Sequence, residues 1–316
     1  MTNFRRIDIT AGRNIGLGLI IALAACALPS CRKQQGADSS STARGRKPQV
    51  CAVNYPLAYF AQRMGGELIE VHFPVPGDVD PAFWNPEPAE VTKLQEADLI
   101  FLNGAGYAKW TQRVSLPESK LLDTTATVKE KYLQVEDVIL HQHGPEGDHS
   151  HEGIAFTTWL DFDIAKEQAS AIHQALKKLL PDQTETLEKR FQKLSDELED
   201  LHQELQSLDA KQHPLFASHP VYQYLAKRYR LNIQSVQWEP DAMPSKAAWK
   251  QLDALSKQHP AKAMLWEASP LPEVQERLEE LGIRCVVFSP LGNTPADGDF
   301  ISMMQNNIQQ LSAAIQ

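Results

Sequence analysis

The sequence is poor in cysteine, has no excess of positive charge and lacks the short motifs that mark common enzymes. Four cysteines in 316 residues are too few for a disulfide framework. A formal net charge of -9 provides no basic face for phosphate groups, so nucleic acid is excluded as a partner and a small cation is favoured. No phosphate-binding loop, Gly-x-Ser-x-Gly turn or His-Glu-x-x-His pair is present, and we therefore do not expect an enzyme.

A long hydrophobic run is also missing at the N-terminus. The uncharged stretch 15–25 follows Arg5, Arg6 and Arg13 and is too short to span a bilayer as a helix, which is typical of a signal peptide. The stretch ends in Leu-Ala-Ala before Cys26. This ending resembles the bacterial lipobox, in which a signal peptidase cuts before a cysteine that is then acylated.

A second cysteine is an alternative site of lipidation. Cys31 follows Leu-Pro-Ser, a poorer match because of its proline, and an ordinary secreted protein with an incidental cysteine is a third reading. We expect residues 1–25 to be the signal peptide and residues 26–48 to be a lipidated, flexible tether rich in polar and basic residues. The protein would then be exported and anchored to the membrane by its lipid, facing the periplasm or the cell surface.

From residue 49 the pattern changes to short apolar strands that alternate with helices. We predict strands at 49–53, 70–74 and 98–102 and helices at 56–64, 89–97 and 164–180. This alternation is typical of a doubly wound α/β lobe whose functional loops follow the carboxyl ends of the strands. We assign residues 49–181 to this N-terminal lobe.

The most periodic segment is 182–209. Its apolar residues step by four and three, which predicts one helix of about 27 residues and roughly 40 Å. The stripe consists of Leu187, Phe191, Leu194, Leu198, Leu201, Leu205 and Leu208. A coiled-coil dimer is the alternative, but so short a heptad run inside an α/β chain favours packing against the chain's own lobes and a monomer.

A second α/β series occupies residues 210–316. We predict strands at 214–218, 233–238, 263–267 and 284–289, and helices at 222–230, 246–258, 272–281 and from residue 300. The expected fold class is therefore α/β, with two doubly wound lobes joined by a single long rigid helix and a ligand cleft between the lobes.

Ordered segments across 50–311 resemble the metal-specific substrate-binding proteins of bacterial ABC importers, of the zinc/manganese type. They include Pro76-Gly77, Asp80-Pro81, Trp159-Leu160-Asp161, Ser218-His219 and Ser289-Pro290-Leu291-Gly292. The resemblance implies that the lobes hold one divalent ion, most simply zinc, as transported solute, with no catalytic cofactor. It also implies an ABC permease and its ATPase as partners.

The resemblance further implies four cleft ligands, of which this chain keeps one. The family's three histidines and one aspartate correspond to Ala82, Thr157, His219 and Ser289. Hydroxyl groups are weak zinc ligands, so we expect the usual site to be absent. His219 follows an apolar strand at the cleft edge, although a hydrogen-bonded structural histidine is an equal alternative.

Two His-x-His pairs form a second candidate metal site. His141, His143, His149 and His151 fall within eleven residues that also contain acidic side chains, and zinc-type relatives carry a His-rich loop here. A solvated loop without any ligand role is the alternative. We expect the solitary histidines on the surface or on helix faces; they are His72, His173, His202 and His213.

Several other residues could line the cleft, namely Trp84, Trp159, Trp238, Glu239 and Glu267. Alternatively, the three tryptophans pack as hydrophobic side chains at the edges of the lobes and do not line the cleft. If they do line it, an aromatic, partly acidic cleft would suit an organic cation or a chelated metal. Cys51 and Cys285 lie in apolar runs of different lobes and are predicted to be buried free thiols.

Three functions remain open. The leading hypothesis is a lipid-anchored receptor of a metal-type importer with an altered central site. The alternatives are a derivative that no longer serves transport, such as a metal buffer, adhesin or accessory protein, and a receptor for a non-metal or chelated-metal solute.

Overall fold

The computed structural model describes residues 46–135, 140–142, 148–150, 153–208 and 213–315. The chain divides into two compact units, Met1–Gly45 and Arg46–Gln316, and only the second contains described residues. The predicted signal peptide and both candidate lipidation sites, Cys26 and Cys31, lie outside them. Among the described helices, none is long and apolar enough to cross a membrane.

The N-terminal lobe is built on a parallel sheet of four strands in the order β2-β1-β3-β4. The strands are β1 Gln49–Ala52, β2 Glu70–His72, β3 Leu99–Leu102 and β4 Leu121–Asp123. Helix α1 (Tyr55–Gly65) follows β1, and α2 (Pro88–Glu96) precedes β3. Asn54 caps α1, because its Oδ1 accepts a hydrogen bond from Leu57 N at 3.2 Å.

Two antiparallel pairs of short strands follow the first sheet. Strands β5 (Gln134–Val135) and β8 (Gly153–Ile154) pair with each other, as do β6 (Leu140–Gln142) and β7 (Asp148–Ser150). The sequence pattern indicated none of these strands, since each has only two or three residues.

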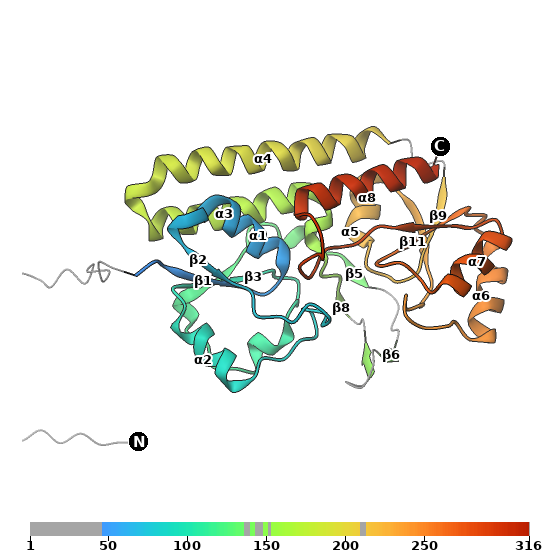
Figure 1. Cartoon of the computed structure of the whole chain (residues 1–316), viewed down its shortest axis with the longest axis horizontal. Helices are drawn as coiled ribbons and strands as arrows, with labels where there is room; N and C mark the ends of the chain where they lie inside the picture. The colour runs from blue at the N-terminus through green and yellow to red at the C-terminus, as the bar shows by residue number, and fades with distance from the viewer. Residues whose placement is uncertain (1–45, 136–139, 143–147, 151–152, 209–212, 316) are drawn as a thin grey trace, which may run out of the picture. The chain divides into compact units, whose positions relative to one another are not determined.

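A helical hairpin connects the two sheets. Helix α3 (Phe162–Leu179) and helix α4 (Thr184–Ser207) are joined through a short turn at Pro181–Gln183. Figure 1 shows α4 lying alongside α3 and continuing beside α8 (Phe300–Ile315), and α4 contacts α1, α3 and α8. One helix therefore packs on elements of both lobes.

The 4,3 stripe of α4 faces the interior of this chain. Five of its leucines are buried, whereas Phe191 and Leu208 at other points of the stripe are half-buried. The buried members are Leu187, Leu194, Leu198, Leu201 and Leu205. Burial of the stripe against the same chain satisfies its apolar surface without a second copy.

The C-terminal lobe repeats the first sheet, with the parallel order β10-β9-β11-β12. Its strands are β9 Pro214–Ala217, β10 Asn232–Ser235, β11 Ala263–Trp266 and β12 Arg284–Val287. Its other helices are α5 Gln223–Tyr229, α6 Lys246–Ser256 and α7 Pro272–Glu280. The predicted two-lobed α/β fold is confirmed. Six of the seven predicted strands end one to three residues earlier than expected, and β3 ends at Leu102 as predicted.

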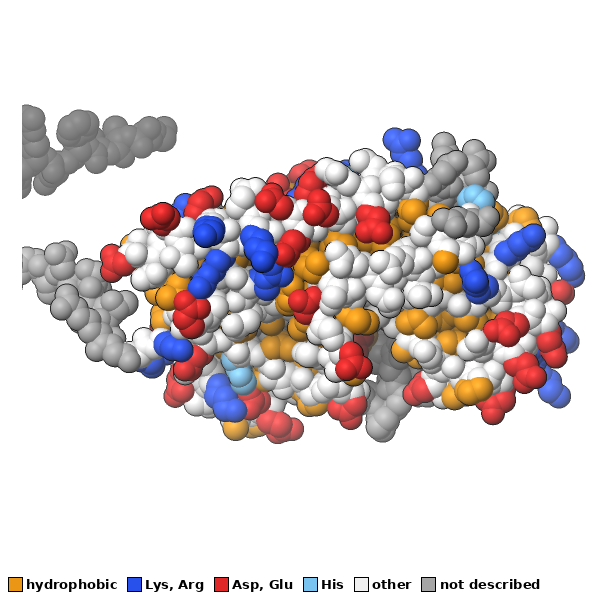
Figure 2. Space-filling view, turned by 45° about the horizontal axis from the view of Figure 1, so that its top comes forward, with side chains coloured by type: hydrophobic (Ala, Val, Ile, Leu, Met, Phe, Trp, Pro, Cys, Tyr) orange, Lys and Arg blue, Asp and Glu red, His pale blue; other side chains and the backbone are white. Residues whose placement is uncertain are grey.

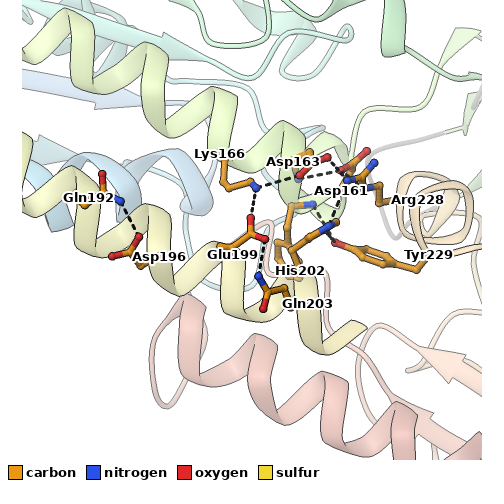
Figure 3. Close-up of polar contacts among 11 residues, drawn as sticks. Asp161, Asp163, Lys166, Gln192, Asp196, Glu199, His202, Gln203, Arg228 and Tyr229 are labelled. Atoms are coloured by element: carbon orange, nitrogen blue, oxygen red, sulfur yellow. Dashed lines mark hydrogen bonds and ion pairs between the residues drawn. The ribbon is translucent and has the colours of Figure 1, made fainter. Parts of the chain in front are cut away.

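A polar network ties the C-terminal lobe to the helical hairpin (Figure 3). Arg228 on α5 pairs with Asp163 at the start of α3, and Lys166 joins Asp163 to Glu199 on α4. His202 on α4 adds a hydrogen bond between its Nδ1 and the Tyr229 hydroxyl at 3.1 Å. These contacts join α5 of the C-terminal lobe to α3 and α4. On the face drawn in Figure 2, charged side chains of both signs are interspersed.

Two of the solitary histidines are buried rather than exposed. His202 lies in the network just described, and His173 on α3 stacks on Phe191 with 4.4 Å between ring centroids. Both histidines are buried because they lie on faces of α3 and α4 that pack against other elements. Cys51 and Cys285 are both free thiols, as predicted; Cys51 is buried, whereas Cys285 is only half-buried because it lies on the edge strand β12.

Candidate functional site between the lobes

A pocket lies where the loops of the two lobes meet. A cavity of about 270 Å³ is lined, among the described residues, by 82–83, 105–107, Lys109, Val135 and 153–157 of the N-terminal lobe and by Pro220, Val221 and Gln223 of the C-terminal lobe. Most of the side chains that line it are apolar. The pocket therefore lies at the loop edge of both sheets, where α/β lobes generally bind ligands.

His219 directly precedes Pro220, one of the residues that line this pocket. Its side chain is buried, and Nδ1 lies 2.8 Å from Glu267 Oε1, at the end of β11. The carboxylate of Glu267 fixes the orientation of the imidazole ring. The same arrangement orients histidines that bind metals in other proteins. The sequence indicated both residues as candidates but did not reveal that they pair.

The other three positions that correspond to family ligands lie around the same loops. Ala82 and Thr157 line the pocket, and Thr157 Oγ1 donates a hydrogen bond to Val221 O at 2.6 Å. Ser289 begins the loop after β12, and its backbone N donates to Asn307 Oδ1 at 3.2 Å. None of the three offers an imidazole or a carboxylate.

Of the two roles that the sequence left open for the tryptophans, the structure shows packing within the lobes rather than an aromatic cleft. Trp159 is 1% exposed, and its Nε1 donates to Pro290 O at 2.6 Å across the lobes. Trp238 is buried with Trp249 in the separate core of the C-terminal lobe, while Trp84 packs edge-to-face on Trp110. These side chains fill the lobes because indole rings bury large apolar areas.

Glu239 is half-buried in the loop that follows β10 and Trp238. It is not among the residues that line the pocket. The other acidic cleft candidate, Glu267, contacts His219.

Three other aromatic residues line the pocket instead, and sequence reasoning missed them. Tyr107 packs edge-to-face on Phe156 and on Trp159, and Phe83 packs on Phe156. They come from three different loops, so no local periodicity could have identified them. Burial, reinforced by the nearby charge of Asp80, raises the pKa of Tyr107 well above its ordinary range, which keeps its hydroxyl protonated.

A buried asparagine holds two of these loops together. Asn103 follows β3, and its Nδ2 donates to Phe156 O at 2.9 Å. Its Oδ1 accepts hydrogen bonds from Asn54, Thr158 and Gln168, at 3.1 to 3.2 Å. Because a buried amide is costly to leave unpaired, this network fixes the position of the loop that carries Phe156 and Thr157.

The His-rich segment is described only in part. The backbones of His141 and His149 pair directly across β6 and β7. His143 and His151 lie outside the described residues. Within the described part of the chain, no group of three or more histidine, cysteine, aspartate or glutamate side chains could hold a metal ion.

Two α/β lobes, a helix that packs on both and a loop-lined pocket between them define the class of two-lobed substrate-binding proteins. A model of the ZnuA family, the periplasmic component A of the zinc-uptake complex, matches residues 50–314. The chain belongs to this family. It is a substrate-binding protein of the metal ABC importer class and not an enzyme.

Individual relatives agree with this assignment. The chain is 25% identical to the high-affinity zinc uptake system protein ZnuA of Bacillus subtilis over 94% of this chain and 97% of the relative. It is 26% identical to the manganese ABC transporter substrate-binding lipoprotein PsaA of Streptococcus pneumoniae, over 69% of each chain. In fold it matches the metal-dependent lipoprotein YcdH of Bacillus subtilis, at 21% identity and a TM-score of 0.71, over 85% of this chain and all of the other.

Proposed function

We propose that this protein is the extracytoplasmic receptor of an ABC importer for zinc, and that its cleft has lost three of the usual four ligands. The observation that carries the proposal is the match of the zinc-uptake family model to residues 50–314, within which the family position His219 is kept and is paired with Glu267. Zinc accepts histidine and carboxylate ligands, and the relatives named above are zinc and manganese proteins.

The replaced positions leave the cleft unable to bind bare zinc tightly. A zinc site needs about four good donors, and Ala82 supplies none. Thr157 and Ser289 carry hydroxyl groups, which bind zinc weakly unless they lose a proton. The Thr157 hydroxyl also already donates a hydrogen bond to Val221 O. His219 would remain as the one imidazole of the family set.

The His-rich segment would supply the missing imidazoles. His141, His143, His149 and His151 lie close together in sequence with acidic neighbours, and the pairing of β6 with β7 brings the backbones of His141 and His149 opposite each other. Ordering of the segment opposes binding, so we expect a modest affinity. The affinity should fall below about pH 6.5, where protons compete with zinc for the imidazoles.

The N-terminal region would attach the receptor to the membrane. We propose that residues 1–25 direct export, that Cys26 or Cys31 is acylated, and that residues 26–48 form the tether. The lobe boundaries would be 49–181 and 210–316, with 182–209 as the linking helix. In this arrangement a lipid-anchored monomer passes its ion to an ABC permease that an ATPase drives.

A titration of the purified protein with zinc and with manganese tests the proposal. We expect saturable binding of zinc; absence of saturable binding of either ion would refute the receptor function. A restored variant tests the ligand replacement. In protein that lacks residues 142–151, A82H/T157H/S289D should create a tight one-to-one zinc site, whereas the control A247H, at an exposed position on α6, should not. Failure of the triple variant to gain zinc would contradict the assignment of these positions.

A further inference from the structure

Hydrogen bonds join the two lobes directly at the loops around the cleft. Thr157 Oγ1 donates to Val221 O at 2.6 Å, and Trp159 Nε1 donates to Pro290 O, also at 2.6 Å. Both bonds are buried. A buried hydrogen bond is costly to break, because its donor and acceptor find no water to replace each other until the lobes separate.

The loop that follows β12 is fastened to the N-terminal lobe at two more points. Asn293 Nδ2 donates to Pro76 O at 2.6 Å and to Val79 O at 2.8 Å, both in the loop after β2. One residue earlier, Gly292 O accepts a hydrogen bond at 2.9 Å from the backbone N of Tyr55, the first residue of α1. The end of the last C-terminal strand thus leads into a loop that the other lobe holds.

The turn within this loop is strained. Leu291 lies between Pro290 and Gly292 and has a φ of 59°, in the left-handed region that bulky residues rarely adopt. Such a conformation persists only where surrounding contacts impose it. The carbonyl groups on both sides of Leu291 accept hydrogen bonds from the N-terminal lobe, at Trp159 and Tyr55. These two bonds therefore hold the turn in place.

The links lie beside positions that correspond to family ligands. Thr157 occupies one such position and makes an interlobe bond itself. Ser289 directly precedes Pro290, and Ala82 lies in the same loop as Val79. The loops that the family's ligand set would join through an ion are thus joined here by groups of the chain itself.

We propose that direct hydrogen bonds between the lobes, and not a bound ion, hold the cleft of this protein closed. The inference rests on the loss of family ligands in the proposed function and adds what closes the cleft in their place. A ligand shifts a conformational equilibrium only by its differential affinity for the two states. Zinc that binds the His-rich segment, which belongs to one lobe, should therefore leave the lobes where they are.

Hydrogen–deuterium exchange of the purified chain, read by mass spectrometry with fragmentation to single residues, tests the inference. Two backbone N–H groups report on lobe separation. Tyr55 N donates to Gly292 O, and Leu133 N donates to the hydroxyl of Tyr224 on α5 at 3.3 Å. Glu70 N donates within the N-terminal lobe and is the internal reference. Both reporters should exchange at the same rate with zinc and with an excess of EDTA.

A double variant removes the side-chain donors. T157V and N293D together delete three hydrogen bonds between the lobes. In EDTA the double variant should exchange at least tenfold faster than the unaltered chain at Tyr55 and Leu133, as expected for the loss of several hydrogen bonds. Exchange at Glu70 should change little.

Controls separate the interlobe bonds from the substitutions themselves. T92V and N85D make the same changes at exposed positions, where the lost bonds to Pro88 O and Phe83 O lie within the N-terminal lobe. T157S keeps the hydroxyl and should exchange like the unaltered chain. If the double variant does not fold, T157V alone must exchange faster than T157S at both reporters.

The outcomes also separate this inference from the proposed function. If EDTA speeds exchange at Tyr55 and Leu133 in the unaltered chain, zinc closes the cleft, and the inference is overturned while the receptor function stands. The inference also fails if the double variant exchanges no faster than T92V/N85D, or if Glu70 speeds up equally. Receptor function is decided by the zinc titration, whose failure would leave these exchange rates unchanged.

Discussion

Truncation of a leucine in the middle of α4 gives the sharpest test of the scaffold. Leu198 is 0% exposed, on the face of the helix that packs between elements of both lobes. Replacing it with alanine removes buried methyl groups and leaves a cavity that rigid neighbours cannot fill. Such changes lower the free energy of unfolding by about 2 to 5 kcal/mol. In a chain of this size a loss of about 3 kcal/mol corresponds to roughly 6 to 12 °C in Tm.

Urea denaturation followed by circular dichroism measures this loss. L198A should shift the midpoint without a change in the slope, because the surface exposed on unfolding stays almost the same. Leu281 is the matched control: it is 55% exposed, and L281A should cost less than about 0.5 kcal/mol. If L198A were no more destabilising than L281A, the stripe would not be packed between the lobes and the linking-helix architecture would be wrong.

Two further predictions concern pH and the anchor. Burial lowers the pKa of His173 below its ordinary value of 6.5, so the unfolded chain binds more protons as the pH falls and stability is lost on acidification below about pH 6.5. H173F keeps an aromatic ring stacked on Phe191 and should reduce the loss of stability on acidification. The control H213F, at an exposed position, should leave that loss unchanged. Equal pH dependence of stability in the two variants would contradict the role given to His173. Changing both Cys26 and Cys31 to serine should release the protein from membranes in cell fractionation, and continued membrane association would rule out the lipid anchor.

The regular elements could be predicted from local patterns. The stripe that contains Leu194 and Leu198 requires a long helix, and the apolar run 99–102 forms a buried strand, as its composition indicates. Strand β4 was missed because Leu121-Leu122-Asp123 is too short to show a period. Strand β10 was predicted too long because Val236 and Trp238 are apolar but pack in the core beyond the sheet.

The site was harder to predict, because residues from distant loops build it. A match of motif positions identified His219 as a candidate, and the contact with Glu267 arises only when the ends of β9 and β11 lie side by side. Phe83 and Phe156 meet through tertiary packing that no spacing in the sequence encodes. The role of Trp159 stayed open between cleft lining and filling of the lobe edge, since its position near a cleft motif did not reveal its buried bond to Pro290.

The most direct test of the central claim is calorimetric titration of zinc into three proteins: the unaltered chain, a variant that lacks residues 142–151, and H219A. The claim is that the His-rich segment holds bare zinc and that the cleft retains only one family ligand. Deletion of the segment should therefore abolish most zinc binding, and H219A should change it little. Tight one-to-one binding that survives the deletion but disappears in H219A would contradict the claim, because the cleft would then hold the ion with ligands such as Glu267.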